Sequence, residues 1–365
     1  MTVNAYDNKE IPLLKEAEKM KETPEKIIDS VKTFFKKTVK EAPLKKTAAF
    51  FKNISVKTVL SAKEKIIPFV LKWWHWMLGA VFALMVLYYP AGALLYHRID
   101  INPRFGAKTQ EASVQTLNTL AELIGRETDQ YAFTPNLPFF FPAAVLDNMP
   151  AFQTGIITAI QKITQAFAVA DPQSEPLKKA ADLLAYPVNV WHVDQWKPAV
   201  SSVKKYRTAG HLISEYAAQE QAGRSAFDPS ARAAEIIINH LVADLKECIA
   251  ALNTQISAGE DKIWDTQADN VFYEVKGQAY VYFLMLRDME KDFKNLFLNE
   301  ALKNKAEKAL SALETAVRIQ PMIVVNGAAE TQFLPNHLSG AGFYLARAAL
   351  DLTDMAQMVR QVENE

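Results

Sequence analysis

The stretch WWHWMLGAVFALMVLYYPAGALLYH, residues 73–97, decides the architecture of this chain, because it contains no Asp, Glu, Lys or Arg. Its apolar centre runs from Met77 to Tyr96 and is 20 residues long. A helix rises about 1.5 Å per residue, so a helix of this length crosses the roughly 30 Å hydrocarbon core of a bilayer. The sequence therefore predicts one transmembrane helix at residues 73–97.

The flanks of this stretch are typical of a membrane span. Lys72 and Arg98 bracket it, and we expect an aromatic anchor in each interface, formed by Trp73, Trp74, Trp76 and Tyr96. Pro90 is tolerated in membrane helices. Two alternatives stay open. A signal peptide could be cleaved near Ala91-Gly92-Ala93, although 72 residues precede the stretch. The stretch could also be a core helix, which its aromatic flanks disfavour.

The stretch separates two segments of opposite charge. Residues 1–72 contain 16 Lys, no Arg and nine acidic residues, a net charge of +7, whereas residues 98–365 contain 25 basic and 32 acidic residues, a net charge of −7. Because basic residues favour the cytoplasmic side of a membrane, we expect residues 1–72 to be a cytoplasmic tail. Residues 98–365 would then form a domain on the opposite side.

The tail contains a predicted amphipathic helix at Lys26–Lys40, with apolar residues at helical spacing between lysines. Such a helix can lie on an anionic membrane surface, and we expect that contact to involve Phe34, Phe35, Lys36 and Lys37. A solvated helix or a helix on a protein partner is the alternative. We expect no nucleic-acid binding, because the tail lacks arginine, the usual base-reading and stacking residue.

Residues 98–365 read as an all-α domain, a helical bundle. Apolar residues recur at helical spacing, and the predicted helices lie near 112–124, 152–168, 175–186, 199–222, 229–258, 265–317 and 340–362, the sixth broken near Asn299. The run Met322 to Val325 could be a strand, but it stands alone. No sustained period-two alternation appears, so we expect helices packed on helices.

A proline-rich loop follows the first of these helices. Its sequence NLPFFFP, residues 136–142, cannot form a regular helix. Three consecutive phenylalanines cannot all face one side, so we expect some of Phe139, Phe140 and Phe141 to meet the core and some to contact lipid or a ligand. Asp147 or Asn148 is expected to cap the next helix.

Two patterns suggest a catalytic site and a metal site. His337, in Pro335–Gly340, could act as a general base if Asp147 met it in space; a structural role for a lone loop histidine is simpler. The second pattern consists of two residue pairs, each four positions apart: His211 with Glu215, and His240 with Asp244. These four side chains could hold zinc or iron if their helices packed together. Unpaired surface residues explain these spacings more simply.

An aromatic stripe at helical spacing includes Tyr273 and Tyr280 and is expected to be core packing or, alternatively, one wall of a ligand or lipid groove. The single cysteine, Cys248, lies in an apolar helical pattern and excludes an intramolecular disulfide. No phosphate-binding glycine loop, zinc-finger cysteine spacing or serine elbow occurs, so we expect no cofactor.

Several short motifs follow the apolar stretch. They are LDNMPAFQ-x-G at residues 146–155, FY-x-x-KG at 272–277, Asn326-Gly327, PNHL at 335–338, and Gly342-Phe343-Tyr344 with Arg347. Together they resemble one bacterial family, the family of domain of unknown function 2333. The resemblance covers roughly residues 75–360 and leaves out the lysine-rich tail. It implies a single-pass protein of the bacterial inner membrane facing the periplasm, and it transfers no activity and no catalytic residues.

Three functions are compatible with the sequence. The first is a non-enzymatic envelope scaffold or binding module, anchored in the lipid bilayer, whose periplasmic domain binds an envelope protein partner. The second is a membrane-tethered hydrolase that uses Asp147 and His337. The third is a lipid-binding domain whose Phe139–Phe141 loop dips into the bilayer.

Overall fold

The computed structural model describes residues 56–106, 114–194, 197–221, 227–259, 265, 267–326 and 335–363. The predicted tail helix at Lys26–Lys40, with Phe34, Phe35, Lys36 and Lys37, lies outside these residues. The chain divides into two compact units between Phe82 and Ala83, and each is described by itself.

Helix α4 (Val56–Tyr96) contains the predicted membrane span. Its segment Lys72–Tyr96 is long and apolar enough to cross a membrane, and only 6% of its most apolar window is buried. The alternative of a core helix is therefore not supported. Trp73, Trp74 and Trp76 are exposed on the first unit, and Tyr96 is exposed at the helix end in the second. Their role as interfacial anchors stays a prediction.

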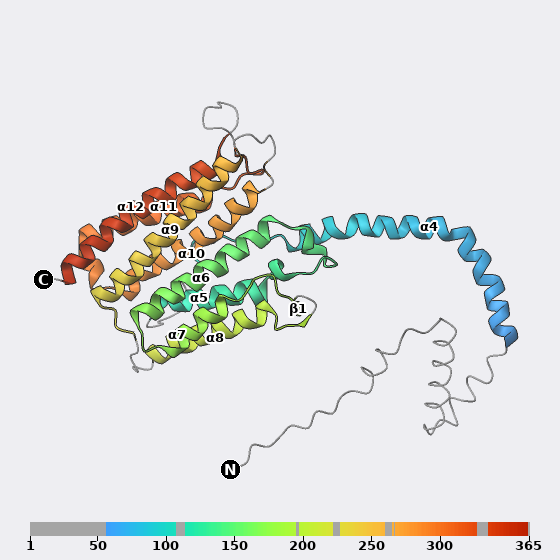
Figure 1. The fold of residues 1–365 in the computed structure, drawn as a ribbon, viewed down its shortest axis with the longest axis horizontal. Helices are drawn as coiled ribbons and strands as arrows, with labels where there is room; N and C mark the ends of the chain where they lie inside the picture. Colours follow the sequence, from blue (N-terminus) through green and yellow to red (C-terminus); the bar gives the residue numbers. More distant parts are fainter. Residues whose placement is uncertain are drawn as a thin grey trace, which may run out of the picture. The chain divides into compact units, whose positions relative to one another are not determined.

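The second unit is all-α, as the sequence predicts. Its helices lie side by side in Figure 1, and their bounds are α5 (Gln115–Gly125), α6 (Asn148–Ala170), α7 (Glu175–Leu184), α8 (Ser202–Gln221), α9 (Ala231–Gly259), α10 (Ala268–Asp292), α11 (Glu300–Arg318) and α12 (His337–Glu363). Among the described residues, the strands are the two-residue β1 (Val193–Asp194) and β2 (Lys197–Pro198), which pair antiparallel. The predicted break in the sixth helix is confirmed at residues 293–299.

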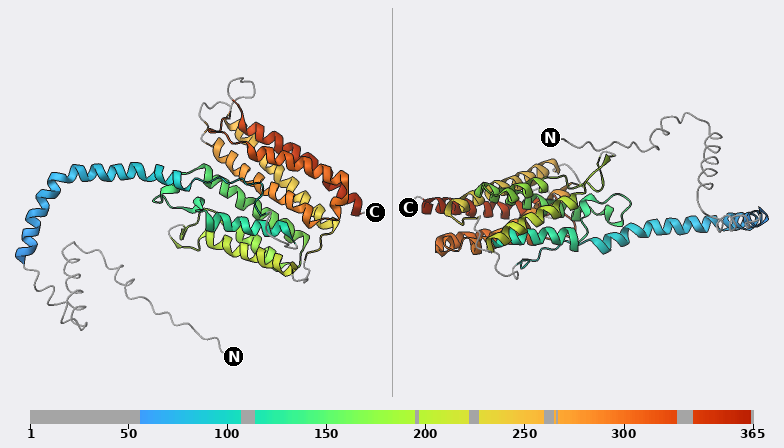
Figure 2. Two further views of the ribbon diagram at one scale, coloured as in Figure 1. Left: turned by 180° about the vertical axis from the view of Figure 1, so that it is seen from behind. Right: turned by 90° about the horizontal axis from the view of Figure 1, so that it is seen from below.

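Helices α6 and α10 form the centre of this unit. They pack closely on each other; α7, α8 and α5 lie on one side, and α9, α11 and α12 lie on the other (Figure 2). One continuous apolar core runs through all these helices. Stripes of apolar residues at helical spacing produce this arrangement, because each helix must bury its stripe against a neighbour.

Local capping sets several of the helix ends. Asn299 accepts hydrogen bonds from the N–H groups of Ala301 and Leu302 at the start of α11, and Ser174 accepts one from Leu177 at the start of α7. The run Met322 to Val325 is irregular, and the described backbone nearby pairs only through an isolated bridge between Asn326 and Asn336. The possible strand is therefore absent.

Candidate functional site: the aromatic junction on α4

The proline-rich loop meets the C-terminal part of α4. The hydroxyl of Tyr88 donates a hydrogen bond to the carbonyl of Phe140 (3.0 Å), and the hydroxyl of Tyr89 donates one to the carbonyl of Phe139 (2.9 Å). Each contact joins residues 50 or more positions apart in the sequence. The loop is therefore fixed to the predicted membrane span itself. We call residues 138–142 the aromatic loop.

A glycine allows this close contact. A Cβ atom placed on Gly92 would lie 2.1 Å from the Cβ atom of Pro142, so no larger residue fits there without a shift. Tyr89, Gly92 and Ala93 fall on one face of α4 and are less exposed than their neighbours. This face is where α4 rests on the aromatic loop.

Trp191 backs the aromatic loop. Its ring centroid lies 5.7 Å from that of Phe140 and 5.9 Å from that of Phe141, both in edge-on geometry. The ring centroid of Phe139 lies 5.5 Å from that of Phe140. Phe139 is 81% exposed, while Phe140 is 48% exposed. The three phenylalanines therefore differ in exposure, and their contact with lipid or a ligand stays a prediction.

The base of the aromatic loop is held by buried polar contacts. Asn136 donates hydrogen bonds to the carbonyl of Val190 (3.2 Å) and to the hydroxyl of Ser201 (3.3 Å), and Gln153 of α6 accepts from the N–H of Thr134 (2.8 Å). The loop and the segment that carries Trp191 are therefore tied to each other and to α6.

Asp147 and His337 have separate structural roles. Asp147 is the N-terminal cap of α6 and accepts from the N–H of Asn148 (2.8 Å). His337 begins α12, and its Nδ1 accepts from the N–H of Val325 (3.0 Å). Burial lowers the pKa of His337, which favours the neutral ring with its proton on Nε2. The structure gives no contact between the two side chains in the described part of the chain, and their catalytic role stays a prediction.

The metal candidates lie on helices with different neighbours. His211 and Glu215 are on α8, which packs on α5 and α7, whereas His240 and Asp244 are on α9, which packs on α12 and α6. Asp244 pairs with Lys162 at 3.4 Å. Among the described residues, no group of three His, Cys, Asp or Glu side chains could hold a metal ion.

The aromatic stripe lies in the core. Tyr280 is fully buried, donates to the carbonyl of Asn102 (2.9 Å) and accepts from Arg126 (3.2 Å); burial raises its pKa to about 12. Tyr273 is 6% exposed. Both side chains are therefore almost inaccessible from the surface, and the binding of a ligand by Tyr273 or Tyr280 stays a prediction.

Among the buried charged residues to which the sequence patterns assigned no role are the neighbours Arg126 and Glu127, and Lys276. Arg126 and Glu127 form an ion pair (2.6 Å) with both residues 1% exposed. Lys276 is 3% exposed and donates to the carbonyl of Ile319 (2.7 Å) at the end of α11; burial lowers its pKa to about 8. Lys276 lies between the aromatic residues Tyr273 and Tyr280 of α10, whereas Arg126 and Glu127 begin the polar run RETDQ, which gives no local sign of burial.

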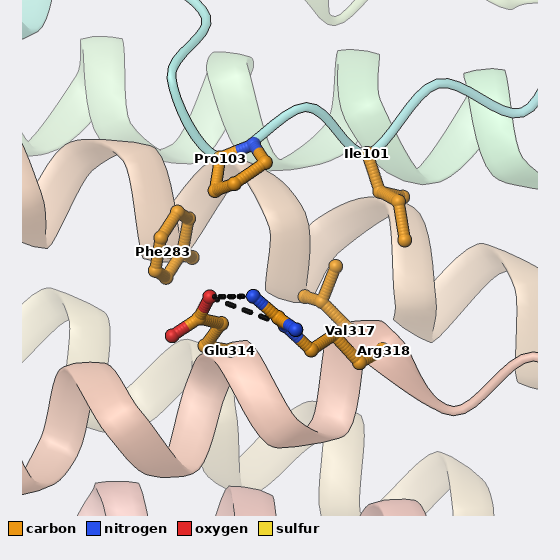
Figure 3. A pocket seen from close by; sticks show the side chains of 6 residues that line it. All are labelled: Ile101, Pro103, Phe283, Glu314, Val317 and Arg318. Carbon is orange, nitrogen blue, oxygen red and sulfur yellow. Dashed lines mark hydrogen bonds and ion pairs between the residues drawn. The ribbon is translucent and has the colours of Figure 1, made fainter.

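Two small pockets lie away from the aromatic loop. One, of about 220 Å³, is lined by Ile101, Pro103, Phe283, Val317 and the ion pair of Glu314 with Arg318 (2.6 Å), which Figure 3 shows. The other, of about 200 Å³, includes His211 together with Glu122, Asp129 and Arg207. Pockets for drug-sized ligands are usually about 300 Å³ or larger, so neither supports a large substrate.

Comparison with known families gave one result. Residues 230–362 match the family described as uncharacterized protein conserved in bacteria (DUF2333). The resemblance inferred from the sequence is confirmed over this segment, which contains α9 to α12 and the motifs at residues 272–277 and 335–347. The motif at residues 146–155 and helix α4 lie outside the match. Comparison with curated proteins and with solved structures gave no match.

Proposed function

We propose that this protein is a non-enzymatic binding module anchored in the bacterial inner membrane, with its helical domain in the periplasm. The charge of the chain supports this orientation, because residues 1–72 carry a net charge of +7 and contain 16 lysines. The match of residues 230–362 to a bacterial family is consistent with this setting.

One observation carries the assignment of a binding module. Among the exposed side chains of α12, Phe343, Arg347 and Leu350 follow one another at intervals of four and three residues. They lie on one helix face within the segment that matches the bacterial family. Phe343 is 58% and Leu350 is 69% exposed. The Arg347 guanidinium lies 5.9 Å from the centre of the Phe343 ring. We call these three residues the α12 face.

The composition of the α12 face suits a protein partner. Aromatic side chains and arginine are enriched in protein interfaces, and they contribute most of the binding energy where they are enclosed by a partner. The envelope protein that covers this face is the partner that we propose.

Crosslinking in intact cells tests the binding. A photoreactive amino acid replaces Leu350 on the α12 face, and the same amino acid at Ser311, an exposed residue of α11, is the matched control. We expect one abundant protein adduct from position 350 and none from position 311. Equal adducts from both positions, or none from either, would contradict a specific partner.

Topology is tested separately. An enzyme that is active only outside the cytoplasm, fused after Glu365, should be active, and a fluorescent protein that folds only in the cytoplasm should stay dark at the same position. The reverse pattern would place the helical domain in the cytoplasm and overturn the proposed orientation.

A further inference from the structure

The aromatic loop contacts α4 within its apolar segment and not beyond it. The loop contacts Tyr88, Tyr89 and Gly92, all inside the apolar segment Lys72–Tyr96. From Tyr88 to Tyr96, α4 rises about 12 Å, and the first charged residue after the span is Arg98. The loop therefore lies beside the final part of the span and not beyond its end.

The side chains in and around the aromatic loop suit a position beside the end of the membrane span. Residues 130–146 contain no charged residue. Phe139 is 81% exposed and Val145 is 54% exposed, and Trp191 lies against Phe140 and Phe141. Exposed aromatic rings next to a membrane helix are typical of the zone between lipid tails and headgroups.

The carbonyl groups of the aromatic loop are also suited to an apolar medium. Lipid supplies no hydrogen bonds, so backbone polar groups there need partners within the protein. Pro138 and Pro142 have no N–H group. All four carbonyls from Pro138 to Phe141 accept hydrogen bonds, and their donors are the Phe141 N–H, the Tyr89 and Tyr88 hydroxyls and the Ala144 N–H.

We propose that the aromatic loop, backed by Trp191, inserts into the bilayer leaflet next to the helical domain and forms a second lipid contact beside α4. The inference rests on the proposed membrane span. Two points of attachment, α4 and the loop, hold the domain at the membrane surface in one orientation, whereas a single helix leaves it free to tilt.

Fluorescence quenching tests this insertion. In a background with Cys248→Ala, single cysteines at positions 139, 343 and 84 are labelled with an environment-sensitive dye. The full chain is then reconstituted in vesicles of phosphatidylcholine and phosphatidylglycerol, with no other protein. Nitroxide groups on the lipid acyl chains report lipid contact, and iodide reports access from water.

The three positions separate the possible outcomes. We expect dye at 139 to emit at shorter wavelength, to be quenched by acyl-chain nitroxide and to lose most iodide quenching. Dye at 343, a similarly exposed phenylalanine on α12, should show the opposite behaviour. Dye at 84, in the middle of the span, should be quenched by lipid nitroxide. If lipid nitroxide quenches the dye at 84 and iodide quenches the dye at 139, α4 spans the membrane and the inference about the loop is wrong. If lipid nitroxide quenches neither dye, α4 does not span the membrane.

A second variant tests the role of the tyrosines. Replacing Tyr88 and Tyr89 by phenylalanine keeps the rings and removes both hydrogen bonds to the loop. We expect iodide quenching at position 139 to rise toward that at position 343, while position 84 is unchanged. Protection of position 139 from iodide in cells but not in protein-free vesicles would mean that a protein covers the loop, and it would overturn the assignment to lipid.

Discussion

Gly155 of α6 and Gly277 of α10 lie where these two helices approach most closely. A Cβ atom on Gly155 would lie 1.9 Å from the carbonyl oxygen of Glu274, and one on Gly277 would lie 2.2 Å from the carbonyl oxygen of Phe152. Each glycine thus faces the backbone of the other helix. The centre of the domain depends on the absence of two side chains.

We expect Gly155→Ala to lower the free energy of unfolding by about 3 kcal/mol, the upper end of what overpacking usually costs. The reason is that the new methyl group meets backbone and no side chain can rotate away. Chemical unfolding of the detergent-solubilised protein measures the effect. The control is Gly342→Ala on α12, where the nearest atom, Leu252 Cδ1, is 3.7 Å away. Equal stabilities of the two variants would contradict the close crossing.

The buried ion pair of Arg126 and Glu127 gives a second prediction. Arg126→Met removes the partner of a 1% exposed carboxylate, so we expect a loss of about 3–5 kcal/mol in stability. Gln153 donates to Glu127 (2.9 Å) and would remain. In the double variant with Glu127→Gln, no unpaired charge is buried, and the loss should be smaller. A double variant as unstable as the sum of both single variants would show that the pair is not coupled.

Asp292 gives a prediction for pH. Burial raises the pKa of Asp292 to about 6, although the carboxylate accepts from the N–H groups of Gln115 and Thr116 at the start of α5. The folded protein binds this proton more tightly than the unfolded chain does. The proton on Asp292 therefore contributes its full stabilisation to the folded state below about pH 4, near the unfolded pKa of about 3.9. This contribution is lost as the pH rises through 6.

The variant Asp292→Asn isolates this effect, because it has no proton to exchange at that position. We expect the wild type to lose stability relative to Asp292→Asn as the pH rises from about 4 to about 7. Melting temperatures of both proteins across this range measure the difference. A difference that stays constant with pH would mean that the carboxyl group titrates normally.

The capping role of Asp147 is tested by Asp147→Ala. Because Asp147 accepts the N–H of Asn148 at the first turn of α6, the alanine variant should lose about 1 kcal/mol of stability. Asp147→Asn keeps a capping oxygen and should stay close to the wild type. Unchanged stability in the alanine variant would leave Asp147 without its structural role and would revive the hydrolase hypothesis.

The helices of this protein were predictable, and most of its contacts were not. Predicted helices at residues 175–186, 199–222 and 229–258 correspond to α7, α8 and α9 with ends that differ by at most three residues. Their periodicity is a local property that each segment carries by itself. The motifs with Gly155 and Gly277 were visible as well, but nothing local indicated that the two glycines meet.

In the candidate site, too, the residue types were predictable from the sequence, and their contacts were not. The sequence marked Phe139–Phe141 for lipid or ligand contact and Tyr88 and Tyr89 as part of the span. It did not pair them, because hydrogen bonds across 50 or more residues depend on how the whole domain folds. The sequence around His337 allows a general base, and only the structure shows that its Nδ1 accepts a hydrogen bond from the N–H of Val325.

The sequence alone determined the apolar span, the charge difference across it and the all-α class. These follow from composition and from spacing within one segment, where solvent preference and backbone hydrogen bonding act locally. The tertiary structure alone decided that the aromatic loop rests on α4, that α6 and α10 cross at glycines, and that Arg126 donates a hydrogen bond to Tyr280 inside the core. Such contacts join distant residues, and their energies exist only when close packing brings those residues together.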